Sequence, residues 1–358
     1  MRVTPNTTMD NSLYYIQRTR TGIDTLQEKI ASGNNYNRPS DDPVSARLLI
    51  GLNDRMAAAD QYNSNITKAD TWFQISNTAM TGMYNFVEQA KQTVSALSGG
   101  LSDTNVVNNA LLQLRSIKQQ IVDMANTQMN GMYIFGGTNN LTKPFMEDSG
   151  AITTGSAVVS MANVADYSVG MAISGVGIPA GTTIASVDTV GNTITMSNAA
   201  TATVADNKLN FYAGNSGEFS IEINQGVSQK VNIPGSYLVL GSAGSTYGTT
   251  DILKTMDQLI ADVTAANEAG ITSGKTALYN AGVQIAAAQS DLQSRLVRID
   301  AAQTMNQSVI NTLKSVYGGV QNVDYAQLGV EISQQKMALE ASLSTTAEVS
   351  RMSLLNYL

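Results

Sequence analysis

The chain has 358 residues, of which 43% are apolar and only 6% aromatic, and its formal net charge is −7. It contains no cysteine and no histidine, which excludes disulfides, thiolate nucleophiles, histidine-based triads and typical zinc sites within this sequence. The acidic balance, with no run of Lys or Arg, argues against a nucleic-acid-binding face. The length suggests two or three domains.

The beginning of the sequence is polar and has no apolar segment, so we expect no Sec-type signal peptide. No stretch approaches the ~18 consecutive apolar residues of a membrane span. These features predict no membrane insertion. They fit either a cytosolic protein or one exported without cleavage, and the lack of cysteine fits export of an unfolded chain.

The first predicted helix runs from residue 13 to residue 30. Its apolar residues follow one another at gaps of three, seven, three and four, which places them on one face of the helix. Gly33-Asn34-Asn35 is expected to end it. The face consists of Leu13, Ile16, Ile23, Leu26 and Ile30.

The segment Ser40-Asp41-Asp42-Pro43 predicts the start of a second helix, because Pro is favoured at the first helical position and Asp42 is a good N-cap. Alternating gaps of three and four then continue to Ser98-Gly99-Gly100, as in a coiled coil. An unbroken helix would be ~80 Å long at ~1.5 Å per residue, so we expect an elongated bundle. The register is Leu49, Leu52, Met56, Ala59, Asn63, Ile66, Asp70, Phe73, Asn77, Met80, Tyr84, Val87, Lys91 and Val94.

A third helix is predicted from about residue 105 to residue 130, before a turn-rich stretch at 131–137. Residues 145–245 differ in kind, being rich in Gly, Thr, Ser, Ala and Val with few charges. Two hairpins are predicted there, one pairing 182–187 with 193–196 and the other pairing 219–223 with 230–233. This region therefore predicts a small β domain inserted into a helical protein.

Helices return after the insert, first at 251–266 and then in a clear heptad repeat that Gly318-Gly319 is expected to end. One position of the repeat holds Leu278, Ile285, Leu292, Ile299, Asn306 and Leu313, and its companion holds Ala281, Ala288, Ala302, Val309 and Val316. The last helix begins near Asp324 and extends to the end of the sequence. Its apolar residues are Tyr325, Leu328, Ile332, Leu339, Leu343, Ala347, Leu354 and Leu358.

The periodicity predicts a mainly α fold with an inserted β domain, in which the long helices form an elongated rod. The expected domains are a terminal coiled-coil layer (1–36 and 322–358), a helical rod domain (37–144 and 246–321) and an inserted β-rich domain (145–245).

The two terminal helices need partners. Five apolar side chains buried by the helix at 13–30 contribute ~7–15 kcal/mol, whereas ordering its backbone costs ~18–36 kcal/mol. Helical hydrogen bonds offset part of this cost, but so short a helix is marginal in water. The ends can pair with each other or pack on neighbouring subunits. An ordinary bundle whose terminal helices dock on its own core fits the periodicity equally well.

Several segments at both ends resemble the flagellin superfamily. They are Leu-Gln-Glu-Lys-Ile-Ala-Ser-Gly at 26–33, Asn-Arg-Pro-Ser-Asp-Asp-Pro at 37–43 and Asn-Gly-Met-Tyr-Ile-Phe-Gly-Gly at 130–137. The C-terminal segments 334–343 and 353–358 (Ser-Leu-Leu-Asn-Tyr-Leu) are most similar to the hook–filament junction branch, hook-associated protein type 3. The resemblance covers roughly 1–145 and 215–358. Residues 150–210 match no family core.

The resemblance implies an elongated coaxial helical bundle in which the N- and C-terminal helices pair and lie innermost, with the β-rich insert as an outer domain. It also implies a non-enzymatic structural role as an adaptor ring at the hook–filament junction. It implies partners: copies of the chain, the hook-side junction protein, flagellin, and a cytosolic export chaperone for the C-terminal helix. It also implies export through the flagellar type III apparatus to the extracellular flagellum. The residues expected at the assembly interface are Leu13, Ile16, Ile23, Leu26, Ile30, Arg38, Asp41, Asp42, Leu328, Ile332, Leu339, Leu343, Leu354 and Leu358.

Two other functions stay open at this stage: a filament-forming flagellin, and a module that binds a surface through its β insert. An enzyme is a remote third, because no active-site constellation is found and no cofactor is expected. Asp41 and Asp42 could ligate a cation, but helix capping is the stronger interpretation. The Gly pairs are turns, since no phosphate-loop Lys-Ser/Thr follows them.

Overall fold

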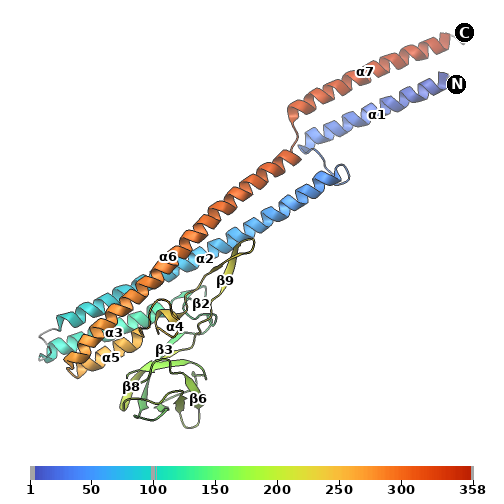
Figure 1. Ribbon diagram of the computed structural model, residues 1–358. Helices are drawn as coiled ribbons and strands as arrows, with labels where there is room; N and C mark the ends of the chain where they lie inside the picture. The colour runs from blue at the N-terminus through green and yellow to red at the C-terminus, as the bar shows by residue number, and fades with distance from the viewer. Residues whose placement is uncertain (1–4, 98–100, 102, 356–358) are drawn as a thin grey trace. The chain divides into compact units, whose positions relative to one another are not determined.

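The computed structural model describes residues 5–97, 101 and 103–355, and these are mainly helical (Figure 1). The chain divides into a terminal unit, residues 1–61 with 306–358, and a central unit, residues 62–305. The long helices α2 and α6 contribute to both units. The helices are α1 (Pro5–Ser32), α2 (Pro43–Ala96), α3 (Thr104–Ala125), α4 (Gly235–Leu238), α5 (Ile252–Thr264), α6 (Glu268–Gln321) and α7 (Tyr325–Leu355).

The strands belong to the central unit and form three antiparallel sheets. Two are hairpins: β1 (Gln128–Met129) with β2 (Met132–Tyr133), and β9 (Ser220–Asn224) with β10 (Val227–Lys230). The third has six strands in the order β5-β8-β3-β4-β7-β6. Its strands are β3 (Phe145–Ile152), β4 (Val158–Met161), β5 (Ala172–Gly175), β6 (Ile184–Asp188), β7 (Thr193–Met196) and β8 (Val204–Tyr212). The predicted mainly helical fold with an inserted antiparallel β domain is confirmed.

The helical core of the central unit follows the predicted heptads. On α2 the residues at every seventh position are buried, and on α6 both rows of the repeat are buried as far as Ile299, whereas Ala302 is only partly buried. This pattern is what packing of long helices along one stripe requires. The buried residues are Ile66, Phe73, Met80, Val87 and Val94 on α2, and Leu278, Ala281, Ile285, Ala288, Leu292 and Ile299 on α6.

The predicted α2 register alternates between two rows of residues. The second of these rows lies one residue away in sequence from the row that the fold buries. Asp70, Asn77, Tyr84 and Lys91 are only half-buried. The most buried companions are Ala69, Ser76, Met83, Ala90 and Leu97. Small residues in this row allow close packing, and the buried Ser76 hydroxyl donates to the carbonyl of Trp72 at 2.8 Å.

The six-stranded sheet has an apolar core of its own, which includes Ile173, Ile194 and Phe211. At its base Phe145 pairs with Tyr212 across β3 and β8, their ring centroids 4.9 Å apart, and both side chains belong to the helical core. The β9–β10 hairpin and α4 also pack on that core. The insert is therefore anchored through its first and last strands.

Two boundaries differ from the predictions. The third helix ends at Ala125 rather than near 130, because the side-chain amide of Asn126 exchanges two hydrogen bonds with the backbone of Phe145, at 2.9 and 3.0 Å. Asn130 and Gly131 then adopt positive φ in the β1–β2 turn. The second difference lies in α6, which continues through Gly318-Gly319 to Gln321, so two helix-weakening glycines do not end it.

Apart from the start of α1, which lies at Pro5 rather than at residue 13, the other element predictions are confirmed within a few residues. Asp42 caps α2, the β6–β7 and β9–β10 hairpins form, and α5 follows its N-cap Asp251. The predicted break at 98–100 lies outside the described residues. Among the described helices, none has the length and apolar character needed to cross a bilayer.

Candidate assembly interface

Helices α1 and α7 form an antiparallel pair in the terminal unit (Figure 1). Their inner ends are joined where the α1–α2 and α6–α7 connections meet in an antiparallel bridge between Asn34 and Asn322. The Asn35 N–H donates to the Gln321 carbonyl at 2.8 Å, and the Val323 N–H donates to the Gly33 carbonyl at 3.1 Å. We call residues 33–36 and 320–323 the clasp.

Side chains reinforce the clasp. The Tyr36 hydroxyl donates to the Val320 carbonyl at 3.0 Å, and the Asn35 amide donates to the Asn322 carbonyl at 3.0 Å. Sequence reasoning identified Gly33-Asn34-Asn35 only as a helix stop. The polar residues Asn35 and Asn322 gave no signal of pairing, because the two segments are separated by almost the whole sequence.

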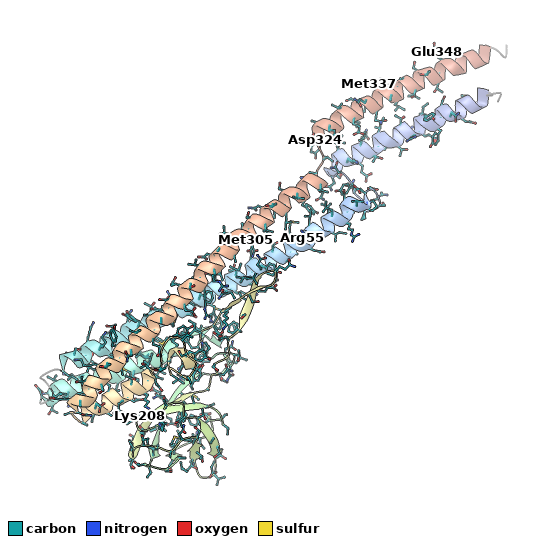
Figure 2. The ribbon with its side chains drawn as sticks, in the orientation of Figure 1. Arg55, Lys208, Met305, Asp324, Met337 and Glu348 are labelled. Carbon is teal, nitrogen blue, oxygen red and sulfur yellow. The ribbon has the colours of Figure 1, made fainter. Side chains whose placement is uncertain are left out.

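The helix ends at the clasp are defined by local chemistry. Gly33 adopts φ +73°, and its N–H donates to the Lys29 carbonyl at 2.9 Å, which ends α1. At the start of α7 (Figure 2), the Asp324 carboxylate accepts from the N–H groups of Ala326 and Gln327 at 2.9 and 3.2 Å. A Cβ added at Gly33 would lie 3.1 Å from the Tyr325 hydroxyl. The position therefore favours glycine on both counts.

The apolar packing between α1 and α7 weakens with distance from the clasp. Leu26, Val323 and Leu328 are buried together, with Ile30 and Ile332 packed against them, and Ile23 is buried one turn further out. Ile16 and Leu339 are half-buried, whereas Leu13 and Leu343 are 48% and 51% exposed. The outer half of the pair therefore leaves its predicted stripe partly open to solvent.

Further large apolar side chains are exposed on the same two helices, and sequence reasoning did not select them. Tyr14 and Tyr15 contact each other edge to face on α1, and Val330 and Met337 (Figure 2) lie exposed on α7. They lie outside the apolar stripe that the periodicity defines on one face of each helix, so the periodicity does not select them. They make the exposed apolar surface wider than the stripe.

Arg38, Asp41 and Asp42 lie in the turn before α2. The Asp41 carboxylate accepts from the Arg38 N–H at 3.0 Å, and the Asp42 carboxylate accepts from the N–H groups of Val44 and Ser45, both at 3.1 Å. Hydrogen bonds from the Ser45 side chain and backbone hold the pKa of Asp42 below its ordinary value. Both acids thus act locally in the turn. Leu354 and Leu358 lie outside the residues whose side chains are described.

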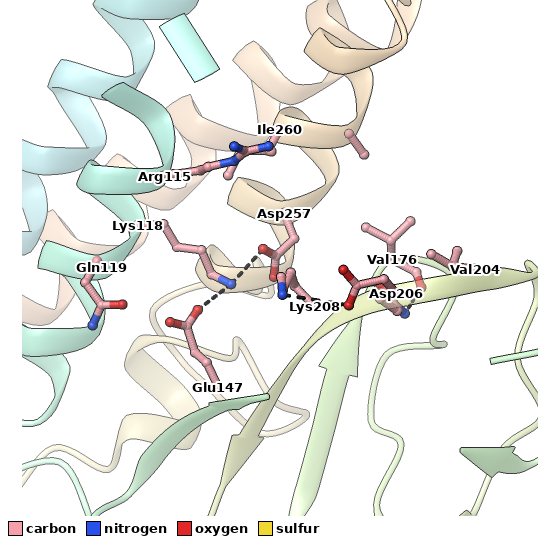
Figure 3. Close-up of a pocket in the computed structure, with 12 residues that line it drawn as sticks. Arg115, Lys118, Gln119, Glu147, Val176, Val204, Asp206, Lys208, Asp257 and Ile260 are labelled. Atoms are coloured by element: carbon pink, nitrogen blue, oxygen red, sulfur yellow. Dashed lines mark hydrogen bonds and ion pairs between the residues drawn. The ribbon is translucent and has the colours of Figure 1, made fainter. Parts of the chain in front are cut away.

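A second notable site is a polar cleft of about 490 Å³ in the central unit, between α3, α5 and the edge of the insert (Figure 3). The Lys118 ammonium is buried there between the carboxylates of Glu147 and Asp257, and lies 2.6 Å from Asp257. The Asn210 amide donates to the second Asp257 oxygen at 2.6 Å. Burial raises the pKa of Asp257 against the opposing effects of Lys118 and Asn210.

This cleft cluster joins the insert to the helices, because its members come from α3, β3, β8 and α5. The closely paired charges fit a structural joint better than acid–base chemistry. Nowhere in the described part of the chain do three or more Asp and Glu residues converge as a metal site.

Parts of the chain are similar to known flagellar proteins. The family model for the bacterial flagellin N-terminal helical region matches residues 3–140. Flagellar hook-associated protein 3 of Escherichia coli is 29% identical over 130 residues, and that of Salmonella typhimurium is 26% identical over 162 residues. Residues 3–140 are thus similar to the N-terminal helical region of bacterial flagellins, and the chain is similar to flagellar hook-associated proteins.

The similarity of the chain to those two relatives is partial. The aligned segments cover 36% and 45% of the chain and span only 41% and 51% of the relatives. A solved structure from Vibrio parahaemolyticus, assigned to the flagellar hook-associated proteins, superposes with a TM-score of 0.56. It is 17% identical and covers 79% of this chain and 100% of its own. This similarity shows a shared fold.

Proposed function

We propose that this chain is a non-enzymatic structural subunit of the bacterial flagellum, one that forms an adaptor ring at the hook–filament junction. The observation that carries the proposal is the terminal helix pair, which is well packed at the clasp and open toward its outer end. Exposed Leu13, Leu343 and Met337 supply apolar surface for neighbouring subunits. The two relatives named flagellar hook-associated protein 3 support the junction as its location.

In this role the interface comprises the α1 and α7 residues named above, together with the turn that contains Arg38, Asp41 and Asp42. Its partners are further copies of the chain, the hook-side junction protein and flagellin. Before export, a cytosolic chaperone covers the C-terminal helix. The location is the extracellular flagellum, reached without cleavage of a signal peptide. The three-part division at 1–36 with 322–358, 37–144 with 246–321, and 145–245 remains part of this proposal.

Two experiments test the junction against the filament alternative. Gold labelling of an epitope-tagged chain on flagellated cells is expected to mark a narrow band between hook and filament, and labelling along the filament would contradict the junction role. Purified chain seeded with its own fragments is expected not to grow long filaments, because an adaptor has different neighbours on its two sides. A variant lacking residues 150–210 tests the surface-binding alternative: loss of cell attachment with motility retained would favour that function.

A further inference from the structure

An apolar groove of about 510 Å³ lies on the central unit, between α2 and the two small hairpins. Ala69 and Trp72 line it from α2, Met129 and Met132 from the β1–β2 hairpin, and Ile221 from β9, with Phe219 just before that strand. Two methionines give the walls flexible side chains that can adapt to an inserted group. Lys68 stands at the rim and is exposed.

The groove contains a donor without an acceptor. Trp72 is 3% exposed, and its indole N–H has no hydrogen-bond partner among the described residues. A buried indole N–H usually finds a partner, and leaving it unpaired costs the hydrogen bond that it would make to water. An occupant that brings an oxygen to this N–H together with an apolar side chain would remove that cost. The Lys68 charge favours an occupant that also carries an acid.

The β6–β7 turn, at the far tip of the insert, presents an apolar side chain, acceptor oxygens and an acid together. Val190 is 94% exposed there, the highest exposure of any large apolar residue in the described chain. One carboxylate oxygen of Asp188 accepts from the N–H groups of Val190 and Gly191 at 3.0 and 3.1 Å, which holds the turn rigid. The backbone carbonyls of Thr189 and Val190 accept no hydrogen bond from the described residues. The turn thus offers an apolar knob, free carbonyl oxygens and an acid.

We propose that the β6–β7 turn of one copy inserts into the groove of a neighbouring copy. Val190 fills the apolar space, a carbonyl of the turn accepts from the Trp72 indole, and Asp188 approaches Lys68. Turn and groove are different surfaces, so the contact is head-to-tail and repeats around a closed ring or along a helix. This contact rests on the proposed self-assembly and adds to it a role for the insert.

Cysteine pairing tests the contact directly, because the chain has no cysteine of its own. A size-tagged Met129→Cys chain is mixed with an untagged Val190→Cys chain and oxidised. We expect a tagged–untagged product well above that formed with Val169→Cys. Val169 is the matched control, a 67% exposed valine in the turn between β4 and β5 of the same sheet.

Trp72 is the only tryptophan, so its fluorescence reports on the groove. With increasing concentration of the full chain we expect a shift in emission that Val190→Asp abolishes and Val169→Asp retains. The inference would be overturned by equal cross-linking from positions 190 and 169, or by the absence of a cross-link at the highest soluble concentration. It would also be overturned if the Met129→Cys product mapped to another segment. Val190→Cys and Met129→Cys chains that reach the junction but do not cross-link to each other there would overturn it and leave the proposed function standing.

Discussion

Replacing Lys118 with Met should strongly destabilise the central unit. The ammonium of Lys118 is buried between Glu147 and Asp257, and its distance to Asp257 is 2.6 Å (Figure 3). Methionine fills a similar volume but leaves the buried Asp257 carboxylate with only the Asn210 amide as a partner. Removing one partner of a buried ion pair costs about 3–5 kcal/mol, because the other charge stays desolvated.

The loss should depend on pH with a definite sign. Burial already raises the pKa of Asp257 in the folded protein, and removing Lys118 raises it further. A carboxyl whose pKa is higher in the folded state binds its proton preferentially there, so stability is lost as pH rises through that pKa. The deficit of Lys118→Met is therefore expected to be largest near pH 7 and smaller near pH 5.

Thermal unfolding followed by circular dichroism measures this effect. For a unit of this size, about 3–5 kcal/mol lowers Tm by roughly 6–20 °C at pH 7. Lys208→Met is the control, because Lys208 lies in the same cleft but is 61% exposed and 3.8 Å from Asp206, so its loss should stay within about 1 kcal/mol. Adding Asp257→Asn to Lys118→Met should recover most of the loss. A Lys118→Met deficit below about 1 kcal/mol, or one equal at pH 5 and pH 7, would refute the reasoning.

Three further predictions follow from packing and backbone geometry. Leu114 on α3 is fully buried in the helical core, so Leu114→Ala should cost about 2–5 kcal/mol in urea unfolding, against almost nothing for Leu112→Ala, whose side chain is 65% exposed; equal costs would contradict this core position. Gly33→Ala should destabilise the α1–α7 pair by about 1–2 kcal/mol and Gly33→Asn by less, because Asn tolerates positive φ; thermal melts of the helical signal compare them. In hydrogen exchange of the monomer, amides near Leu13 and Leu343 should exchange faster than those near Leu26 and Leu328, and assembly should slow them; strong monomer protection at Leu343 would count against assembly-coupled folding.

Periodicity was sufficient to predict the helices and the insert, because buried stripes repeat regularly in the sequence. It failed where small or polar residues are buried. Ala69, Ser76 and Ala90 form a buried row on α2 that a pattern of large apolar residues does not reveal. Arg295 occupies a heptad position with almost no exposure, since it donates to the Asn232 carbonyl at 3.1 Å and pairs with Asp291 at 2.7 Å. Asp291 lies one turn before Arg295 on α6, but Asn232 comes from a distant segment, which no local pattern indicates.

The same limit applies to the candidate interface. The apolar stripe correctly selected Ile23, Leu26 and Leu328, which helix packing buries near the clasp, and Ile332, which is partly buried beside them. The clasp, by contrast, depends on backbone groups and asparagines, which carry no hydrophobic signal. The cleft and the groove likewise arise from side chains that only the fold brings together.

The exposed heptad positions of α6, like the partly exposed outer ends of α1 and α7, indicate that another chain packs against the terminal unit. On α6 the repeat continues unchanged through Val309 and Val316, yet within the terminal unit these residues are 40% and 44% exposed. In the central unit the corresponding Ala281 and Ala288 are fully buried by helices of the same chain. A sequence that keeps apolar residues where its own fold provides no cover is best explained by cover from another chain. The terminal unit is therefore the part of the molecule whose packing we expect assembly to complete.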